Sequence, residues 1–308
     1  MRCGDLVRSD VSLSEKIAII SELNQQMFSA SGLIELVEEL LQYAILVPEI
    51  GETAVDLVGT GGDGFKTLNF STLATFVAAA AGTPMAKHGN KAVTSKCGSF
   101  DLLQRMQVNL PKDAVAARIE FAKNQLVFLF APYFHPVMAE VVAARKHFAD
   151  LGQKTIFNCI GPLLNPARVK RIVAGVFAPE LIPAYAEALQ YFGVQSAYIV
   201  HGSGLDEITL TGPTQYAKIE NGKISFGVWR VADFALAECN ITELEGGGPA
   251  QNYAAAKALF AEELTGPKSD MVLLNAAAAI RVWSDFKLDW QQSLQKARRG
   301  LSRVELAG

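Results

Sequence analysis

The clearest structural signal in this sequence is the segment Asp56-Leu-Val-Gly-Thr-Gly-Gly-Asp-Gly-Phe-Lys-Thr-Leu-Asn-Phe-Ser-Thr72. An apolar run from Ala54 to Val58 predicts a buried strand. Four glycines follow, and then hydroxyl and amide side chains precede a helical run that ends at Ala81. Glycines let a backbone approach a phosphate and expose successive N–H groups, while a helix N-terminus contributes the positive end of its dipole. The order of strand, glycine turn and helix start is therefore typical of an anion site.

A glycine cluster after a strand is equally typical of a tight turn, and serine or threonine before a helix is typical of an N-cap. The segment matches neither the dinucleotide-binding G-x-G-x-x-G pattern nor the P-loop. A second segment, Lys87-His-Gly-Asn-Lys-Ala-Val-Thr-Ser-Lys-Cys-Gly-Ser99, favours the anion site. Its lysines, histidine and hydroxyl side chains suit a phosphate and not an apolar core. We expect the two loops to face each other across the end of a sheet and to bind a polyphosphorylated ligand.

The composition indicates a globular protein whose overall charge does not suggest nucleic-acid binding. Of 308 residues, 50% are apolar and 19% are charged, and the formal net charge is −3. The four cysteines form no C-x-x-C pair, which favours a reducing cytoplasm over a zinc site or a disulfide framework. The N-terminus lacks the apolar core of a signal peptide, and no apolar run reaches membrane-spanning length. We expect a cytoplasmic protein without membrane or nucleic-acid partners.

Hydrophobic periodicity predicts an α/β fold in which helices flank a mainly parallel central sheet. Residues 12–46 have a helical pattern with Ser12 and Ser31 as expected caps, and residues 48–52 have that of a linker. Predicted strands are 54–58, 85–87, 126–130, 172–177, 197–200 and a segment near 216–219. Predicted helices are 71–81, 99–106, 112–122, 136–148, 180–192 and most of 250–304. Residues 207–245 have a more antiparallel pattern, with a hairpin turn at Asn221-Gly222.

Several motifs together resemble the anthranilate phosphoribosyltransferase family. They are Gly-Thr-Gly-Gly-Asp-Gly, Thr-x-Asn-x-Ser-Thr and Lys-His-Gly-Asn in the two loops, then Thr155-Ile-Phe-Asn-x-x-Gly-Pro-Leu-x-Asn-Pro166, Val200-His-Gly-x-Gly-Leu-Asp-Glu207 and Leu274-Asn-Ala-Ala277. They follow the family order from about Ser12 to about Trp283. The resemblance implies a small helical domain, 1–49 with a returning segment near 132–167, and a large α/β domain, 50–308. The active site would lie in the cleft between them.

The implied reaction is a step of tryptophan biosynthesis. The phosphoribosyl group of 5-phosphoribosyl 1-pyrophosphate is transferred to the amine of anthranilate, and pyrophosphate leaves. An aromatic amine is a sufficient nucleophile for a cationic ribose carbon, so positioning and electrostatics carry the catalysis without a dedicated catalytic side chain. The resemblance also implies Mg²⁺ as cofactor and a homodimer. Two alternatives stay open: a related phosphoribosyltransferase with another aromatic or nitrogen acceptor, and a non-catalytic relative that binds a phosphorylated ligand or nucleic acid.

The resemblance assigns the binding residues by position. The pyrophosphate and ribose would contact Gly59, Gly62, Asp63, Thr67, Asn69, Phe70, Ser71 and Thr72. The second loop would close over the phosphates with Lys87, Gly89, Asn90, Lys91, Thr94, Ser95 and Ser99. The metal would be held by Ser71, Asp206 and Glu207, because oxygen ligands suit magnesium.

The acceptor needs a cation for its carboxylate and an apolar wall for its ring. Arg145 matches the carboxylate-binding arginine of the family, Gly161 and Pro162 would line the ring, and His88 would contact the acceptor. Between Arg145 and Gly152 the chain is longer than the family pattern, which is why another acceptor remains an alternative.

Overall fold

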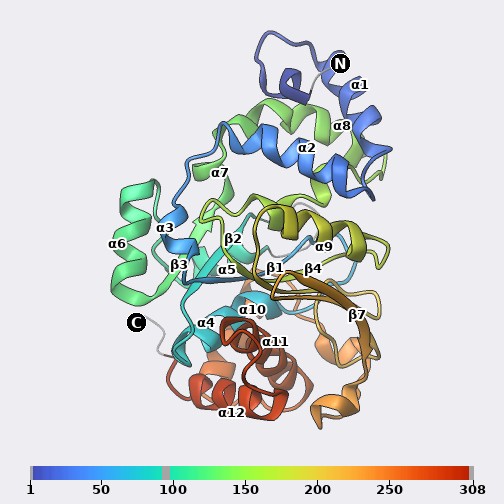
Figure 1. Ribbon diagram of the computed structural model, residues 1–308. Coiled ribbons are helices and arrows are strands. Elements are labelled where there is room, and N and C mark those ends of the chain that lie inside the picture. Colours follow the sequence, from blue (N-terminus) through green and yellow to red (C-terminus); the bar gives the residue numbers. More distant parts are fainter. Residues whose placement is uncertain (1–2, 92–97, 305–308) are drawn as a thin grey trace.

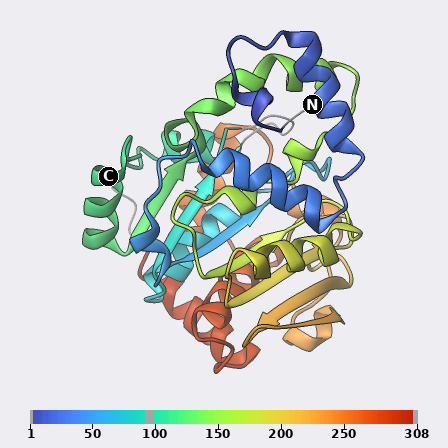
Figure 2. The same ribbon diagram turned by 45° about the horizontal axis from the view of Figure 1, so that its top comes forward.

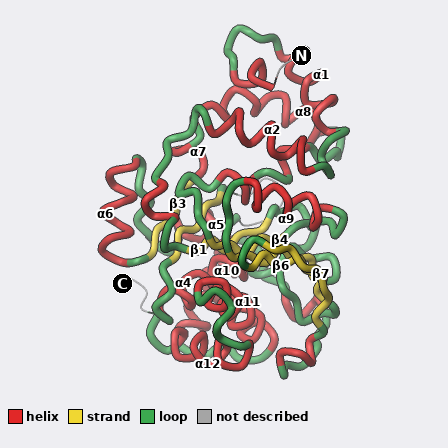
Figure 3. The backbone as a smooth tube through the Cα atoms, viewed as in Figure 1, coloured by secondary structure: helices red, strands yellow, loops and turns green. Residues whose placement is uncertain are grey.

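The computed structural model describes residues 3–91 and 98–304, which form a three-layer α/β structure (Figures 1 and 3). Their seven-stranded sheet has the order β3-β2-β1-β4-β5-β6-β7. The strands are β1 (Val55–Gly59), β2 (Met85–Gly89), β3 (Leu126–Phe130), β4 (Arg171–Gly175), β5 (Ser196–Gly202), β6 (Thr214–Glu220) and β7 (Lys223–Trp229). The first five are parallel to one another, whereas β6 is antiparallel to β5 and β7 is antiparallel to β6, which confirms the predicted fold class.

Apolar side chains cover both faces of the parallel strands, as expected for a sheet buried between helices. In β4, Ile172 and Ala174 face one core and Val173 faces the other. The second core lies under α4 (Phe70–Ala80), α10 (Pro249–Phe260), α11 (Pro267–Trp283) and α12 (Trp290–Leu301). On the first face, α9 (Leu181–Tyr191) packs on β5 and β6.

A helical lobe stands above that first face and is formed by α1 (Leu13–Asn24), α2 (Ala30–Leu41) and the returning helix α8 (Val142–Asp150) (Figures 1 and 2). Lys16 of α1 is buried and pairs with Glu140, just before α8, at 3.0 Å. The apolar core of the lobe is continuous with the sheet face beneath it. The returning segment therefore completes the packing of the N-terminal helices.

Three local predictions differ from the structure, and the predicted hairpin turn at Asn221-Gly222 is confirmed. Ser12 caps α1 as expected, but Ser29, and not Ser31, accepts the capping hydrogen bond of α2, from Gly32. The expected linker forms a short helix, α3 (Pro48–Gly51), because Pro48 is tolerated in a first helical turn. The helix predicted at 136–148 is divided into a 3₁₀ turn (Pro136–Val141) and α8. Edge strand β7 forms the second arm of the predicted hairpin; its turn residue Asn221 has a φ of 51°.

The remaining helices connect the parallel strands. They are α5 (Ser99–Arg105), α6 (Ala114–Asn124) and α7 (Ala131–Phe134). Further 3₁₀ turns lie elsewhere along the chain, at Cys3–Val7, Ile156–Asn158, Gly161–Leu164, Val231–Phe234 and Ile241–Leu244. None of the helices in the described ranges is both long and apolar enough to cross a membrane.

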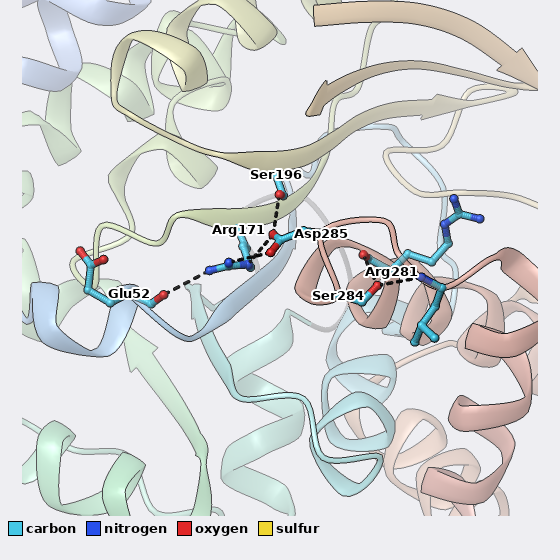
Figure 4. A network of polar contacts seen from close by, with 7 residues as sticks. Glu52, Arg171, Ser196, Arg281, Ser284 and Asp285 are labelled. Carbon is cyan, nitrogen blue, oxygen red and sulfur yellow. Dashed lines mark hydrogen bonds and ion pairs between the residues drawn. The ribbon is translucent and has the colours of Figure 1, made fainter. Parts of the chain in front are cut away.

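A polar network fixes the amino ends of β4 and β5 (Figure 4). Arg171 donates two hydrogen bonds to Asp285, at 3.0 and 3.1 Å, and Ser196 donates one at 2.8 Å. Arg171 also donates to the carbonyl of Glu52 at 3.2 Å. Because Asp285 follows α11, this network anchors that helix at the edge of the sheet opposite to the glycine-rich loop.

Candidate active site

The candidate site lies at the carboxyl ends of the parallel strands, beside the point where the strand order reverses. The chain leaves β1 towards β2 and leaves β4 towards β5, although β1 and β4 are neighbours. Ligands of open α/β sheets bind in the crevice at such a switch point. A cavity of about 580 Å³ lies there, and both predicted loops and the helical lobe contribute to its lining.

Two neighbouring glycines make room for an acidic side chain over this edge. Gly59 and Gly175 are paired in register at the ends of β1 and β4. A Cβ on Gly59 would lie 2.0 Å from Oδ2 of Asp206, and a Cβ on Gly175 would lie 1.6 Å from its carbonyl oxygen. The backbone N–H of Gly61 donates to Asp206 at 2.6 Å. Gly175 was not predicted from the sequence, although a glycine also ends β1, β2 and β5 and this recurrence is visible in the sequence.

Three carboxylates gather beside these glycines. Burial, reinforced by the charge of Asp206, raises the pKa of Asp63 to about 7. Glu207 is partly buried, and burial, reinforced by the charges of Asp206 and Asp63, raises its pKa well above the usual range. One of its oxygens accepts from the N–H of Ser71 at 3.3 Å, whereas Oε2 is buried without a hydrogen-bond partner in the described structure. An unpartnered oxygen among mutually repelling carboxylates is an environment that a cation would stabilise.

The oxygens of these carboxylates suit magnesium better than they suit a metal whose ligands all come from the protein. Within residues 3–91 and 98–304, no group of three or more histidine, cysteine or acidic side chains has a geometry that would hold a metal by itself. Magnesium usually binds one or two carboxylates and takes its other ligands from water and substrate phosphates. Ser71, Asp206 and Glu207 all line the cavity and agree with such an open site.

Lys87 lies beneath the site and not in the loop above it. It belongs to β2, its side chain is 1% exposed, and its ammonium donates to the carbonyl of Leu57 and, at 3.2 Å, to Ser71 Oγ. Burial lowers its pKa, opposed by the charge of buried Asp56. Burial in turn raises the pKa of Asp56 to about 7. Lys87 therefore supports Ser71 and the acidic cluster from below.

The start of α4 connects both loops. Asn69 precedes the helix, and its side-chain amide donates to the carbonyl of Gly98 in the second loop at 3.2 Å. Its own backbone N–H is held by the carbonyl oxygen of the Asn252 side chain at 3.0 Å. Asn252 is buried in α10. Its role was not predicted from the sequence, because Asn69, which it contacts, lies 183 positions away along the chain.

The other end of the cavity is formed by the helical lobe and is more apolar. Arg145 of α8 lines it, and its guanidinium lies 5.5 Å from the ring centre of Phe157. Burial lowers the pKa of Arg145, and no carboxylate pairs with it among the residues that the structure describes. Lys146 is exposed and pairs with Asp150 instead. This end is suited to a planar apolar ligand that carries a carboxylate.

The cavity brings most of the predicted residues together. Its lining includes Gly59, Gly62, Asp63, Thr67, Asn69, Ser71, Lys87, His88, Gly89, Asn90, Lys91, Ser99, Arg145, Gly161, Asp206 and Glu207. Three others, Phe70, Thr72 and Pro162, are buried and absent from the lining, because the start of α4 and the 161–164 turn direct them into the protein. Thr94 and Ser95 lie outside the described residues. His135 and Phe157 line the cavity without having been predicted.

Comparisons with known proteins agree on one family. Residues 51–303 match the glycosyl transferase family a/b domain. The anthranilate phosphoribosyltransferase of Halobacterium salinarum is 40% identical over 273 residues, which cover 89% of this chain and 80% of that protein. The anthranilate phosphoribosyltransferase structure from Thermus thermophilus has a TM-score of 0.88 at 34% identity, covering 98% of this chain and 89% of the other.

A second structural relative was solved with ligands. The Saccharomyces cerevisiae anthranilate phosphoribosyltransferase in complex with PRPP and Mg has a TM-score of 0.86 at 29% identity, covering 96% of this chain and 85% of that chain. Sequence identity, family model and fold therefore agree with the geometry of the cavity: the chain belongs to the anthranilate phosphoribosyltransferase family.

Proposed function

We propose that this protein transfers the phosphoribosyl group of 5-phosphoribosyl 1-pyrophosphate to the amine of anthranilate, with release of pyrophosphate, in tryptophan biosynthesis. The observation that best supports this proposal is that the two ends of one cavity differ in their chemistry. Its sheet end has a glycine loop and carboxylates. Its lobe end has Arg145, with which no carboxylate pairs among the described residues, beside apolar side chains. The first end suits a metal-bound polyphosphate, and the second suits an aromatic carboxylate.

The glycine loop would position the donor. Gly61, Gly62 and Gly64 have φ values of 68°, 78° and 85°, so their backbone turns tightly at the edge of the sheet. The start of α4 directs N–H groups towards the same place. Asp206 and Glu207 with Ser71 would hold Mg²⁺, which when bound offsets negative charge on the departing pyrophosphate. Asn90 and Lys91 line the same cavity and would contact the phosphates.

The lobe end would position the acceptor. The planar guanidinium of Arg145 matches a carboxylate in geometry and charge, which compensates the desolvation of that group. Phe157, beside it, would contact the ring. Holding the amine against the ribose carbon turns the reaction into an effectively unimolecular step. The placement of Arg145 in the cavity favours anthranilate over the alternative of another acceptor.

We further propose the assembly and boundaries of the protein. Leu13, Phe28 and Val142 are exposed apolar side chains of the helical lobe, with 49%, 49% and 59% exposure, and would form a homodimer contact. The small domain would comprise 1–49 and 132–167, and the large domain the rest of 50–308. A cytoplasmic location remains our prediction from the scattered cysteines.

The test is a direct assay. The protein is incubated with 5-phosphoribosyl 1-pyrophosphate, Mg²⁺ and anthranilate, and the loss of anthranilate fluorescence is followed. We expect turnover that stops with excess chelator. Release of pyrophosphate without loss of anthranilate would instead assign the protein to another acceptor, and absence of both signals would refute a transferase function.

A further inference from the structure

Two polar residues of the sequence motifs lie beneath the cavity and have no role in it so far. Asp56 begins the glycine-rich segment, and Asn165 belongs to the motif that ends at Pro166. Neither of them lines the cavity, and they are only 0% and 3% exposed. Burial of a carboxylate is unfavourable unless hydrogen bonds compensate it, so the contacts of Asp56 indicate what it does.

Both residues lie where the backbone pairing of β1 with β2 stops. These two strands pair in register only at Val55 and Met85, whereas β1 pairs with β4, on its other side, at five positions. Buried backbone groups beyond that point need other partners. The carbonyl of Leu57, for example, accepts from the ammonium of Lys87. Side chains therefore replace the backbone ladder between the carboxyl ends of β1 and β2.

Asp56 and Asn165 together connect the two strands beyond the ladder. Oδ1 of Asp56 accepts from the backbone N–H of His88 at 3.4 Å, and Oδ2 accepts from Nδ2 of Asn165 at 2.7 Å. Nδ2 also donates to the carbonyl of Ala86 at 2.9 Å, and the side-chain oxygen of Asn165 accepts from the N–H of Ala167 at 2.8 Å. The pair thus joins β1, β2 and the segment that returns from the helical lobe.

The same two strands carry the two loops of the donor site. The glycine-rich loop follows β1 after Gly59, and the second loop follows β2 after Gly89, beginning with Asn90 and Lys91, which line the cavity. Because the ladder has stopped, side-chain hydrogen bonds determine how far apart these loops begin. A ligand bound by both loops depends on that separation, since a misplacement of about 1 Å can lower a rate by about a hundredfold.

We propose that Asp56 is a positioning residue, which together with Asn165 sets the separation of the two loops that bind the donor. This assignment rests on the proposed function, because it takes the pyrophosphate group of the donor as the ligand that both loops share. Asp56 does not contact the ligand and acts through the N–H of His88 and through Asn165. A carboxylate suits this role because each of its two oxygens accepts one of the two donors.

The test exchanges the two side chains. In Asp56→Asn the amide oxygen can still accept from His88, but the new NH₂ group then faces the NH₂ group of Asn165, and their hydrogen bond is lost. The double variant Asp56→Asn/Asn165→Asp restores a donor and an acceptor between the two positions and leaves only the carbonyl of Ala86 without its donor. Asp285→Asn is the matched control, because it makes the same chemical change in the network at the amino ends of β4 and β5 (Figure 4).

Isothermal titration calorimetry measures the Kd of pyrophosphate in the presence of Mg²⁺, and urea unfolding measures stability. Asp56→Asn should raise this Kd at least about tenfold, and the exchange variant should return it to within about threefold of the wild-type value. Asp285→Asn should lower stability and change the Kd by less than about twofold. If Asp56→Asn does not fold, Asn165→Ala removes the same hydrogen bond and should raise the Kd in the same way.

A wild-type Kd in a folded but less stable Asp56→Asn protein would show that the carboxylate only stabilises the fold, and it would overturn the proposal. An equally raised Kd in the single and exchange variants would overturn it too, because the restored pair would then not set the loops. Calorimetry requires no turnover. Failure to consume anthranilate would refute the proposed acceptor alone, whereas failure of the wild-type protein to bind pyrophosphate would refute the donor site and this role of Asp56 with it.

Discussion

A side chain at Gly175 and the backbone of Asp206 cannot occupy their present positions together, because a Cβ would lie 1.6 Å from the Asp206 carbonyl oxygen. The location of the acidic cluster thus depends on a glycine at the end of a neighbouring strand. Gly175→Ala should displace Asp206 and lower kcat at least about a hundredfold, the scale of losing one electrostatic group in an active site. Circular dichroism should show a folded protein, and Asp206→Asn should reproduce the loss. Wild-type activity in folded Gly175→Ala would contradict this dependence.

The acidic cluster should couple metal to phosphate binding. Asp206→Asn combined with Glu207→Gln should lower turnover at least about a hundredfold. The same double variant should lose the rise in melting temperature that Mg²⁺ with pyrophosphate gives the wild-type protein, since ligand binding to the native state stabilises it. Differential scanning fluorimetry measures this shift. A shift of wild-type size in the double variant would remove these carboxylates from the metal site.

Buried Lys87 should matter for stability as well as for binding. Lys87→Met would leave the carbonyl of Leu57 and the hydroxyl of Ser71 without their donor. We expect a loss of about 1–3 kcal/mol in the free energy of unfolding, the usual effect of orphaned buried acceptors. Urea titration at pH 7 gives this value. Lys91→Met is the matched control, because Lys91 is exposed and its replacement should change the stability by less than about 0.5 kcal/mol.

Arg145 should act on one substrate only. Arg145→Gln should raise the anthranilate KM at least about tenfold, or roughly 1.4 kcal/mol, because the acceptor carboxylate loses its cation. The KM for 5-phosphoribosyl 1-pyrophosphate should change by less than about twofold, since the phosphate loops lie at the other end of the cavity. Initial rates with each substrate varied in turn separate the two constants. Lys146→Gln, next along α8, should behave like the wild-type protein in both.

The buried histidines also predict a pH dependence of stability. The native pKa values of His88 and His135, about 3 and about 4, lie below the ordinary value of 6.5. Between these native pKa values and pH 6.5, the unfolded chain binds more protons than the native protein. The free energy of unfolding is therefore highest above pH 6.5 and decreases as the pH falls below that value. Each ring contributes up to about 1.4 kcal/mol per pH unit. Urea unfolding at pH 7, 6 and 5 should give a shallower slope for the His88→Asn/His135→Gln double variant, and equal slopes would contradict the depressed pKa values.

Local patterns predicted the strands and the first loop well, because a buried parallel strand requires an apolar run and the tight turn after it requires glycine. All six predicted strands are present, with ends shifted by a few residues. Contacts between distant segments could not be read in this way. Asn252 supports Asn69 across 183 positions, and His135 meets His88 only because the helical lobe folds back over the sheet. The choice between Ser29 and Ser31 as cap depended on a shift of two residues in the start of α2, which periodicity does not resolve.

The construction of the helical lobe has a consequence during synthesis. The apolar faces of α1 and α2 pack against α8 and α9, and about 100 residues separate the end of α2 from the start of α8. At about 5–20 residues per second, a ribosome needs roughly 5–20 s to cover that distance. During this interval the nascent N-terminal helices expose Ile20, Leu33 and Leu36, which are completely buried in the finished protein. We therefore expect the emerging chain to present apolar surface that holdase chaperones can bind until the returning segment has left the exit tunnel.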